Sequence, residues 1–255
     1  MTAKAPGRST ADPWLLAIDT GTSKIVVGAG RLDGSLIRAM DWPAGYRHGE
    51  LLLAGVEQLL AETGLSRGDI AGIVVGTGPG AFTGLRVGLA TAKTMAHALG
   101  LPIVGVSTGE ALLHAARSIP DQVGTPGAGE AKAGDREAGD REAGDPVLLL
   151  PAGPRDRVLV RRAEAPRLLP LGSDPDDSDE RALVAVDLEG RAPARAVRRG
   201  EGARAGLGAA LLEIGAGRLR ADEADDVVRL VPEYVTLPRG IRAATGEIAW
   251  SRDPR

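Results

Sequence analysis

The chain has 255 residues, of which 43% are hydrophobic, so it can bury the core of one large domain or of two small ones. Its net charge of −3 excludes a broadly basic nucleic-acid-binding surface, and the lack of cysteine excludes disulfides and thiolate metal sites. Residues 1–13 are small and polar, without a signal core or a membrane span, so we expect a disordered N-terminus and a cytoplasmic protein without membrane contact.

The first predicted elements are two strands joined by a tight turn. Residues 14–18 form a continuous apolar run, which is typical of a buried strand, and residues 24–31 return as a second strand. The N–H groups and hydroxyls of the turn suit an anion, and its carboxylate suits a hard cation. The pattern of strand, Asp-Thr-Gly turn and strand resembles the start of actin-like and sugar-kinase-like ATPases, and this resemblance makes the turn a candidate nucleotide-binding site, functional or vestigial. A plain hairpin turn is the alternative. The candidate residues are Asp19, Gly21, Thr22 and Ser23.

A third strand over residues 35–41 leads to a predicted helix over residues 48–63, which Gly64 ends. Apolar residues occupy a wider arc of this helix than one buried face needs. We therefore expect a second packing partner for the helix, and the alternative is that Leu51 simply covers a neighbouring loop. The apolar residues that matter most are Leu52, Val56 and Leu60.

A glycine-rich unit follows. Residues 73–75 predict a buried strand, the glycine loop over residues 76–84 has a sharply defined path, and Thr83 is the expected N-cap of a helix that ends at Gly100. A strand over residues 103–106 should pair in parallel with the first. Small residues recur at every fourth position of the helix, and they favour close approach of a partner helix or, equally, packing inside their own domain. These residues are Gly88, Ala92 and Ala96.

The second half of the chain is separated by a low-complexity segment over residues 118–145, in which Gly-Asp-Arg-Glu-Ala occurs twice. Such a composition cannot offset its ordering entropy, so we expect a mobile linker. A short helix over residues 109–116 precedes it, and an acidic loop over residues 174–180 follows it. Beyond the linker we predict strands at 147–150, 157–162, 183–187 and 227–231, and a helix at 206–214. The predicted division is 1–13, an N-terminal lobe over 14–117, the linker over 118–145, and a C-terminal lobe over 146–255.

Residues 78–93, Gly-Pro-Gly-Ala-Phe-Thr-Gly-Leu-Arg-Val-Gly-Leu-Ala-Thr-Ala-Lys, closely resemble the signature of the TsaB (YeaZ-like) family. The resemblance also takes in residues 17–20, 47–52 and 105–108 and a Pro-x-Tyr pattern within 231–235, and it is weak over the rest of the C-terminal half. It implies an α/β, two-lobed, actin-like and sugar-kinase-like (ribonuclease H-like) fold with a smaller, divergent second lobe. The signature-loop residues are Gly78, Pro79, Gly80, Phe82, Thr83, Gly84 and Arg86.

The resemblance implies an accessory role in tRNA modification. Catalytic relatives hold a metal with two histidines four residues apart on a helix, and Thr108 and Leu112 stand at those places here, so no catalytic or metal-binding residue is expected. The family members are subunits required for threonylcarbamoyladenosine formation at position 37 of tRNAs that read ANN codons. They act as a dimerisation platform for the catalytic homologue TsaD, which the ATPase TsaE joins. The implied interface residues are Leu52, Val56, Leu60, Gly88, Ala92 and Ala96.

The resemblance also bears on ligands. It implies no cofactor of the chain's own, with ATP and Mg used by the complex, weak nucleotide binding at most, and tRNA reached through the complex. A homodimer of the isolated chain remains open. The alternative class is a small ATP-dependent kinase of the sugar-kinase type, against which stand the short chain and the lack of a second phosphate motif in the C-terminal lobe. ATP turnover by the isolated chain separates the two.

Overall fold

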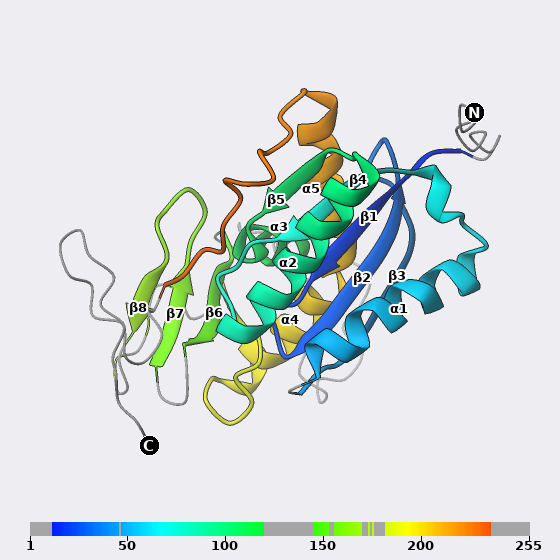
Figure 1. Ribbon diagram of the computed structural model, residues 1–255. Coiled ribbons are helices and arrows are strands. Elements are labelled where there is room, and N and C mark those ends of the chain that lie inside the picture. Colours follow the sequence, from blue (N-terminus) through cyan, green and yellow to red (C-terminus); the bar gives the residue numbers. More distant parts are fainter. Residues whose placement is uncertain are drawn as a thin grey trace, which may run out of the picture.

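A computed structural model of the chain describes residues 12–45, 47–119, 145–152, 156–169, 173, 175 and 182–235. It contains two β-sheets with helices on both faces of the first and between the two (Figure 1). The predicted linker lies almost entirely outside the described residues, as do nearly all of residues 1–13 and of the acidic loop over 174–180. The predicted division into lobes therefore stays a prediction.

The first sheet has the strand order β3-β2-β1-β4-β5. Strands β1, β2 and β3 pair antiparallel, whereas β4 and β5 continue the sheet in parallel on the other side of β1. This arrangement is the ribonuclease H-like half of an actin-like fold. The strands are β1 (Trp14–Asp19), β2 (Lys24–Arg31), β3 (Leu36–Pro43), β4 (Ile70–Gly76) and β5 (Ile103–Val106).

The second sheet is smaller and has the order β8-β7-β6-β9. Its strands β6, β7 and β8 form an antiparallel meander, and β9 pairs in parallel with β6. The α/β, two-lobed fold expected from the sequence is thus confirmed. The strands are β6 (Val147–Ala152), β7 (Asp156–Val160), β8 (Arg167–Leu169) and β9 (Leu183–Ala185).

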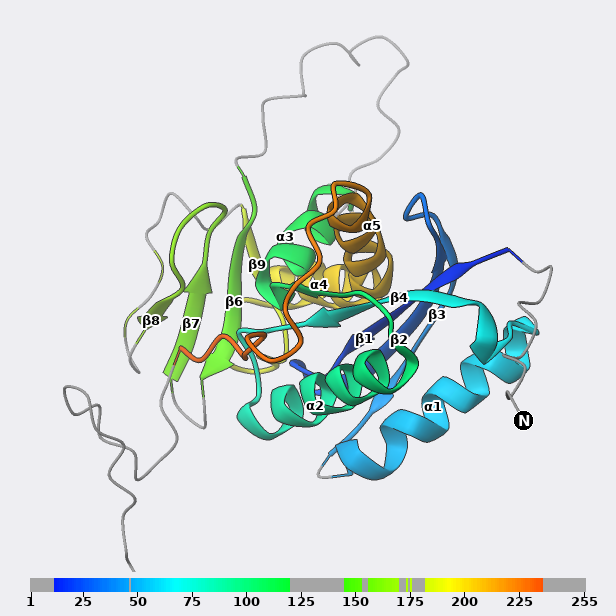
Figure 2. The same ribbon diagram turned by 45° about the horizontal axis from the view of Figure 1, so that its top comes forward.

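Two layers of helices sandwich the first sheet (Figure 2). Alternate residues of β1 face opposite layers: Leu16 packs with α1 and α2, and Leu15 with α3 and α5. Helix α5 crosses all five strands of the first sheet, although it follows the second sheet in the sequence. The helices are α1 (His48–Thr63), α2 (Phe82–Leu99), α3 (Thr108–Arg117), α4 (Ala194–Ala205) and α5 (Leu207–Arg220), with a short 3₁₀ turn over Arg67–Asp69.

Several predictions about element ends were wrong. Helix α2 begins at Phe82 with Ala81 as its N-cap, because the N–H of Ala81 donates to the carbonyl of Gly21 (2.8 Å) and fixes the chain there, so Thr83 caps nothing. Residues 227–229 form a turn and residues 230–231 are irregular, so the predicted strand over 227–231 is absent. Helix α5 continues to Arg220 through Gly215, which packs on Val74 and leaves no room for a side chain. Helix α4 and strand β8 were not predicted.

Candidate functional site

The turn between β1 and β2 carries a fully buried carboxylate. Asp19 accepts hydrogen bonds from the N–H of Gly21 (2.8 Å) and from the hydroxyl of Thr108 (2.6 Å). Burial raises the pKa of Asp19 to about 6, although the Thr108 and Gly21 hydrogen bonds oppose the rise. Both carboxylate oxygens are therefore already engaged within the chain.

Glycines let the loop and the helix of the signature approach this turn. A Cβ at Gly76 would overlap the Asp19 carboxylate, and one at Gly80 would overlap the carbonyl of Gly21. On α2, a Cβ at Gly84 would overlap the carbonyl of Thr20, and one at Gly88 would overlap the Thr20 hydroxyl, which donates to the carbonyl of Gly84 (2.7 Å). The glycines of the signature thus seat the turn against the start of α2.

Ser23, the last residue of the turn, is hydrogen-bonded to a residue of the second lobe. The N–H and the hydroxyl of Ser23 each donate to the carboxylate of Asp187 at 2.6 Å, and Arg204 of α4 pairs with the same carboxylate at 2.6 Å. The side chains of Asp187 and Arg204 are only 10% and 14% exposed, so this ion pair is almost buried.

The residues of this turn do not fit the phosphate and magnesium that an actin-like fold implies. The carboxylate expected to help hold the metal has both oxygens hydrogen-bonded, and burial disfavours its charge. The donors expected to receive a phosphate face the negative carboxylate of Asp187 instead. Thr22, another of the four candidate residues, makes side-chain hydrogen bonds only to the backbone of Lys24.

A strap over residues 225–235 brings in a residue that the sequence did not single out. The hydroxyls of Thr77 (2.7 Å) and Ser107 (3.2 Å) donate to the carboxylate of Glu233, and the N–H of Glu233 donates to the carbonyl of Thr77 (2.7 Å). Glu233 is the middle residue of the Pro-x-Tyr pattern, and that pattern was the available signal. The strap therefore covers the carboxyl ends of β4 and β5.

Phe82, the aromatic residue of the signature loop, makes its contacts beside Glu233. The Arg86 guanidinium lies 3.8 Å from the centre of the Phe82 ring and donates to the hydroxyl of Tyr234 (2.9 Å). The Phe82 and Tyr234 rings are 5.0 Å apart. The two parts of the family resemblance, separated by some 150 residues, meet here at the surface.

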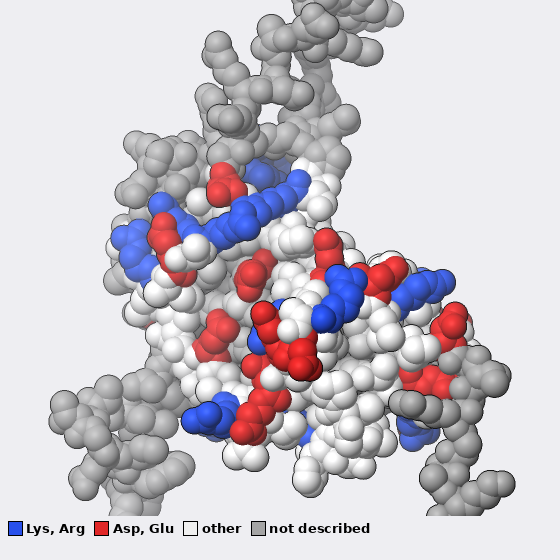
Figure 3. Space-filling view, turned by 90° about the horizontal axis from the view of Figure 1, so that it is seen from above, with Lys and Arg blue, Asp and Glu red and all other residues white. Residues whose placement is uncertain are grey.

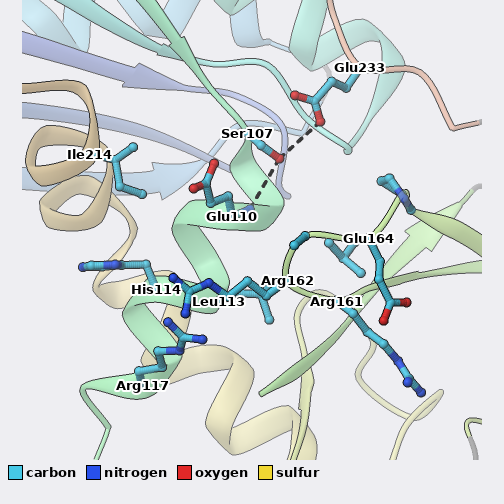
Figure 4. A pocket seen from close by; sticks show the side chains of 13 residues that line it. Ser107, Glu110, Leu113, His114, Arg117, Arg161, Arg162, Glu164, Ile214 and Glu233 are labelled. Atoms are coloured by element: carbon cyan, nitrogen blue, oxygen red, sulfur yellow. Dashed lines mark hydrogen bonds between the residues drawn. The ribbon is translucent and has the colours of Figure 1, made fainter. Parts of the chain in front are cut away.

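A cavity of about 400 Å³ opens next to the strap, between α3 and the loop after β7 (Figure 4). Glu110 and Glu233 lie toward one end of it, and His114, Arg117 and Arg162 lie together toward the other (Figure 4). Arg117 pairs with Asp145 (2.6 Å) and His114 with Glu213 (3.0 Å). The described parts of the chain bring no group of three or more His, Asp or Glu side chains together for a metal ion. The lining residues are Ser107, Glu110, Leu113, His114, Arg117, Val160, Arg161, Arg162, Ala163, Glu164, Pro166, Ile214 and Glu233.

The two places that hold histidines in catalytic relatives have other roles here. Thr108 is fully buried, donates to Asp19 and accepts a hydrogen bond from the N–H of Gly78 (3.0 Å). Leu112 is fully buried in the core between the sheets. Neither side chain faces an open site.

The predicted interface stripe does not lie on the surface. Leu52, Val56, Ala92 and Ala96 are at most 4% exposed and pack in the core between α1, α2 and the first sheet, and Leu60 packs against its edge. Gly88 touches Thr20. These residues pack within their own lobe, and the expectation that they meet a partner stays a prediction. The exposed leucine of α1 is Leu53, at 52%.

The face of the molecule seen from above the view of Figure 1 carries both acidic and basic side chains; acidic ones gather near its middle, and most of the basic ones lie around them (Figure 3). This mixture agrees with the balanced composition. None of the helices that the structure describes is long and apolar enough to cross a membrane.

Comparisons with known proteins agree with this architecture. Residues 43–129 match the family described as TsaD, tRNA N6-adenosine threonylcarbamoyltransferase. An uncharacterised protein of Mycobacterium bovis is 39% identical over 99 residues, which are 38% of this chain and 47% of that protein. The tRNA threonylcarbamoyladenosine biosynthesis protein TsaB of Escherichia coli is 37% identical over 94 residues, 37% of this chain and 40% of TsaB. The chain thus spans less than half the length of these curated relatives.

The fold comparison extends further along the chain. YeaZ from Pseudomonas aeruginosa superposes with a TM-score of 0.57 at 22% identity, covering 88% of this chain and all of YeaZ. The likeness therefore includes the second lobe, where sequence similarity is weak. The chain thus has the fold of YeaZ, and part of its N-terminal half is similar in sequence to TsaB and to the TsaD family.

Proposed function

We propose that the chain is a non-catalytic subunit required for threonylcarbamoyladenosine formation at position 37 of tRNAs that read ANN codons. It acts as a dimerisation platform for a catalytic TsaD homologue, with a TsaE ATPase and tRNA joining through the complex. The similarity to TsaB and to the TsaD family supports this class of function. The single observation that carries the non-catalytic role is the filling of the expected metal place by Thr108 and Leu112.

The chemistry of these two residues supports that role. The Thr108 hydroxyl is used by Asp19 and by the N–H of Gly78, and Leu112 carries no donor atom. A metal-assisted acyl transfer needs ligands with free lone pairs and an open coordination position. A threonylcarbamoyl transfer is therefore assigned to the partner.

The surface assigned to the partner is the outer side of α1 and α2, since their inner side is buried in the lobe. Leu53 on α1 is 52% exposed and Leu99 at the end of α2 is 49% exposed. Exposed leucines on two neighbouring helices suit a helical partner face. Helices α1 and α2 cover one face of the first sheet, and the second sheet lies to the side of them, so their outer side is open to a partner (Figure 2).

The test is reconstitution. The purified chain alone is expected to leave tRNA unmodified, and addition of the TsaD homologue and TsaE of the same organism, with the threonylcarbamoyl donor, is expected to restore modification. Modification by this chain alone, free of the partner, would overturn the proposal.

A variant pair locates the contact. Leu53→Arg places a charge on the proposed face and should weaken binding to TsaD at least tenfold, about 1.4 kcal/mol or more. Leu32→Arg is the matched control, because Leu32 is 42% exposed just after β2, away from α1 and α2. Both should keep the wild-type circular dichroism, and calorimetric titration measures the affinity. Equal affinity of the two variants contradicts this placement.

A kinase of the sugar-kinase type is the competing function. The engaged turn argues against it, because Asp19 and Ser23 have no free group for a nucleotide. ATP turnover by the isolated chain at the rate of a metabolic kinase would favour it.

A further inference from the structure

Three hydrogen-bond donors converge on one carboxylate at the β1–β2 turn. The Ser23 N–H donates to Oδ2 of Asp187, and the Ser23 hydroxyl and Arg204 Nη1 donate to Oδ1, each at 2.6 Å. A turn N–H, a hydroxyl and a guanidinium are the groups that proteins use to hold phosphate or carboxylate oxygens. We propose that this turn is an anion site whose permanent ligand is the chain's own Asp187, which excludes nucleotide phosphate and ties the two lobes together.

The backbone at Asp187 is shaped for this contact. Asp187 has φ of 57°, in the left-handed region that residues other than Gly, Asn and Asp rarely adopt. It comes two residues after the end of β9, and the unusual conformation turns its side chain from the second sheet toward Ser23. An aspartate suits both demands, since it tolerates this φ and supplies the anion.

The tie joins parts that are far apart in the sequence. Ser23 ends the turn of the first sheet, Asp187 follows β9 of the second sheet 164 residues later, and Arg204 lies in the last turn of α4. In an actin-like fold the implied nucleotide would bridge the lobes at this turn. Here a nearly buried ion pair does so without a ligand, so closure of the lobes does not depend on nucleotide.

The experiment replaces the internal ligand. Asp187→Gly removes the carboxylate while keeping the left-handed backbone unstrained, and it leaves the three donors in place. Amide hydrogen exchange at Ser23, with inorganic phosphate as the probe, is the main readout. We expect exchange about tenfold faster or more than in the wild type, because a hydrogen bond to a charged group is lost. Millimolar phosphate should slow it again and raise the melting temperature.

The matched control is Asp222→Gly. Asp222 is also an aspartate with a left-handed backbone, φ of 60°, and no hydrogen bond or ion pair of its side chain joins it to another described residue. Exchange at Ser23 should stay at the wild-type rate in this variant and should not respond to phosphate. Asp187→Asn, which keeps an acceptor but loses the charge, serves if the glycine variant does not fold, and its exchange should also rise.

The outcomes separate clearly. Slowing of Ser23 exchange in the wild type by phosphate or by Mg-ATP would overturn the proposal, since the site would then not be filled. So would unchanged exchange in both Asp187 variants, or fast exchange that phosphate does not reverse in Asp187→Gly. None of these readouts uses tRNA or TsaD, so their failure is distinct from failure of the proposed function.

Discussion

At the scale of single residues, Asp19 is costly to ionise in the folded chain. Its carboxyl group is fully buried, and burial raises its pKa from 3.8 to about 6. In the unfolded chain the group ionises first as the pH rises, so between about pH 4 and pH 6 the folded state binds more protons. Stability from this group is therefore lost as the pH rises, and above pH 6 the cost is constant.

The rise of the Asp19 pKa from 3.8 to about 6 corresponds to about 3 kcal/mol. We predict that the free energy of unfolding of the wild type, taken relative to Asp19→Asn, falls by this order between pH 4 and pH 7. The amide keeps an acceptor for the N–H of Gly21 but does not titrate. Denaturant unfolding of both proteins across this range measures the difference, and a flat difference would show that Asp19 ionises as freely in the folded chain as in the unfolded one.

At the scale of elements, the small residues of α2 allow close packing against neighbouring segments and are not there to make the helix flexible. Gly84 and Gly88 touch Thr20, and Ala92 and Ala96 lie in the core. The helix thereby rests directly on the β1–β2 turn. Small residues four apart on a helix predict a close neighbour, and here that neighbour is a hairpin of the same lobe.

Gly88→Ala should destabilise the fold by about 1–3 kcal/mol, the usual cost of overpacking, because the new Cβ overlaps the Thr20 hydroxyl. Gly217→Ala on α5 is the matched comparison, since a Cβ there meets nothing within 4 Å. That change should stabilise by about 0.5–1 kcal/mol through helix propensity. Thermal unfolding of both variants gives the sign of each stability change. A change of the same sign in both variants would contradict the packing described for α2.

Ala92→Arg gives a sharper test of the same helix. Ala92 is fully buried, so a long charged side chain has neither space nor a partner there. We predict loss of the folded state, at a cost of several kcal/mol. Circular dichroism and size-exclusion chromatography report it, and a folded Ala92→Arg protein that merely fails to bind TsaD would restore the partner-facing interpretation of the stripe.

At the scale of the whole molecule, the strap over residues 225–235 closes the open edge of the first sheet. The N–H of Gly105 donates to the Asp225 carboxylate (2.8 Å), and the carbonyls of Ile103 and Gly105 accept from Asp225 and Arg218. Three backbone groups of β5 that face outward are thus satisfied by two side chains and by one N–H of the strap.

Two truncations isolate the strap. A chain ending at residue 224 should melt at a lower temperature than one ending at residue 235 and should aggregate during the melt, because it exposes the β5 edge. Light scattering during thermal unfolding measures both effects. Equal melting temperatures of the two truncations would mean that the strap adds nothing to stability.

Local signals predicted most of the strands and the glycine ends of α1 and α2, but they missed α4 and β8 and could not predict contacts between distant segments. Gly64 and Gly100 end their helices in the left-handed conformation, with φ of 69° and 63°, as their positions predicted. The orientation of the α2 stripe was ambiguous, since helix and hairpin neighbours favour the same spacing. The contact of Ser23 with Asp187 spans 164 residues and leaves no periodic trace in the sequence.

The edge contact also sets an order of events during synthesis. Gly105 of β5 and Asp225, which accepts a hydrogen bond from its N–H, are 120 residues apart. At about 5–20 residues per second, the ribosome therefore synthesises Asp225 roughly 6–24 s after Gly105. For that interval the nascent first sheet has an unpaired edge that another nascent chain can join. Helix α5, which crosses the same sheet, emerges only shortly before the strap. A lower rate of translation initiation keeps neighbouring nascent chains apart. It should therefore raise the soluble yield more than cooling the protein after its synthesis does.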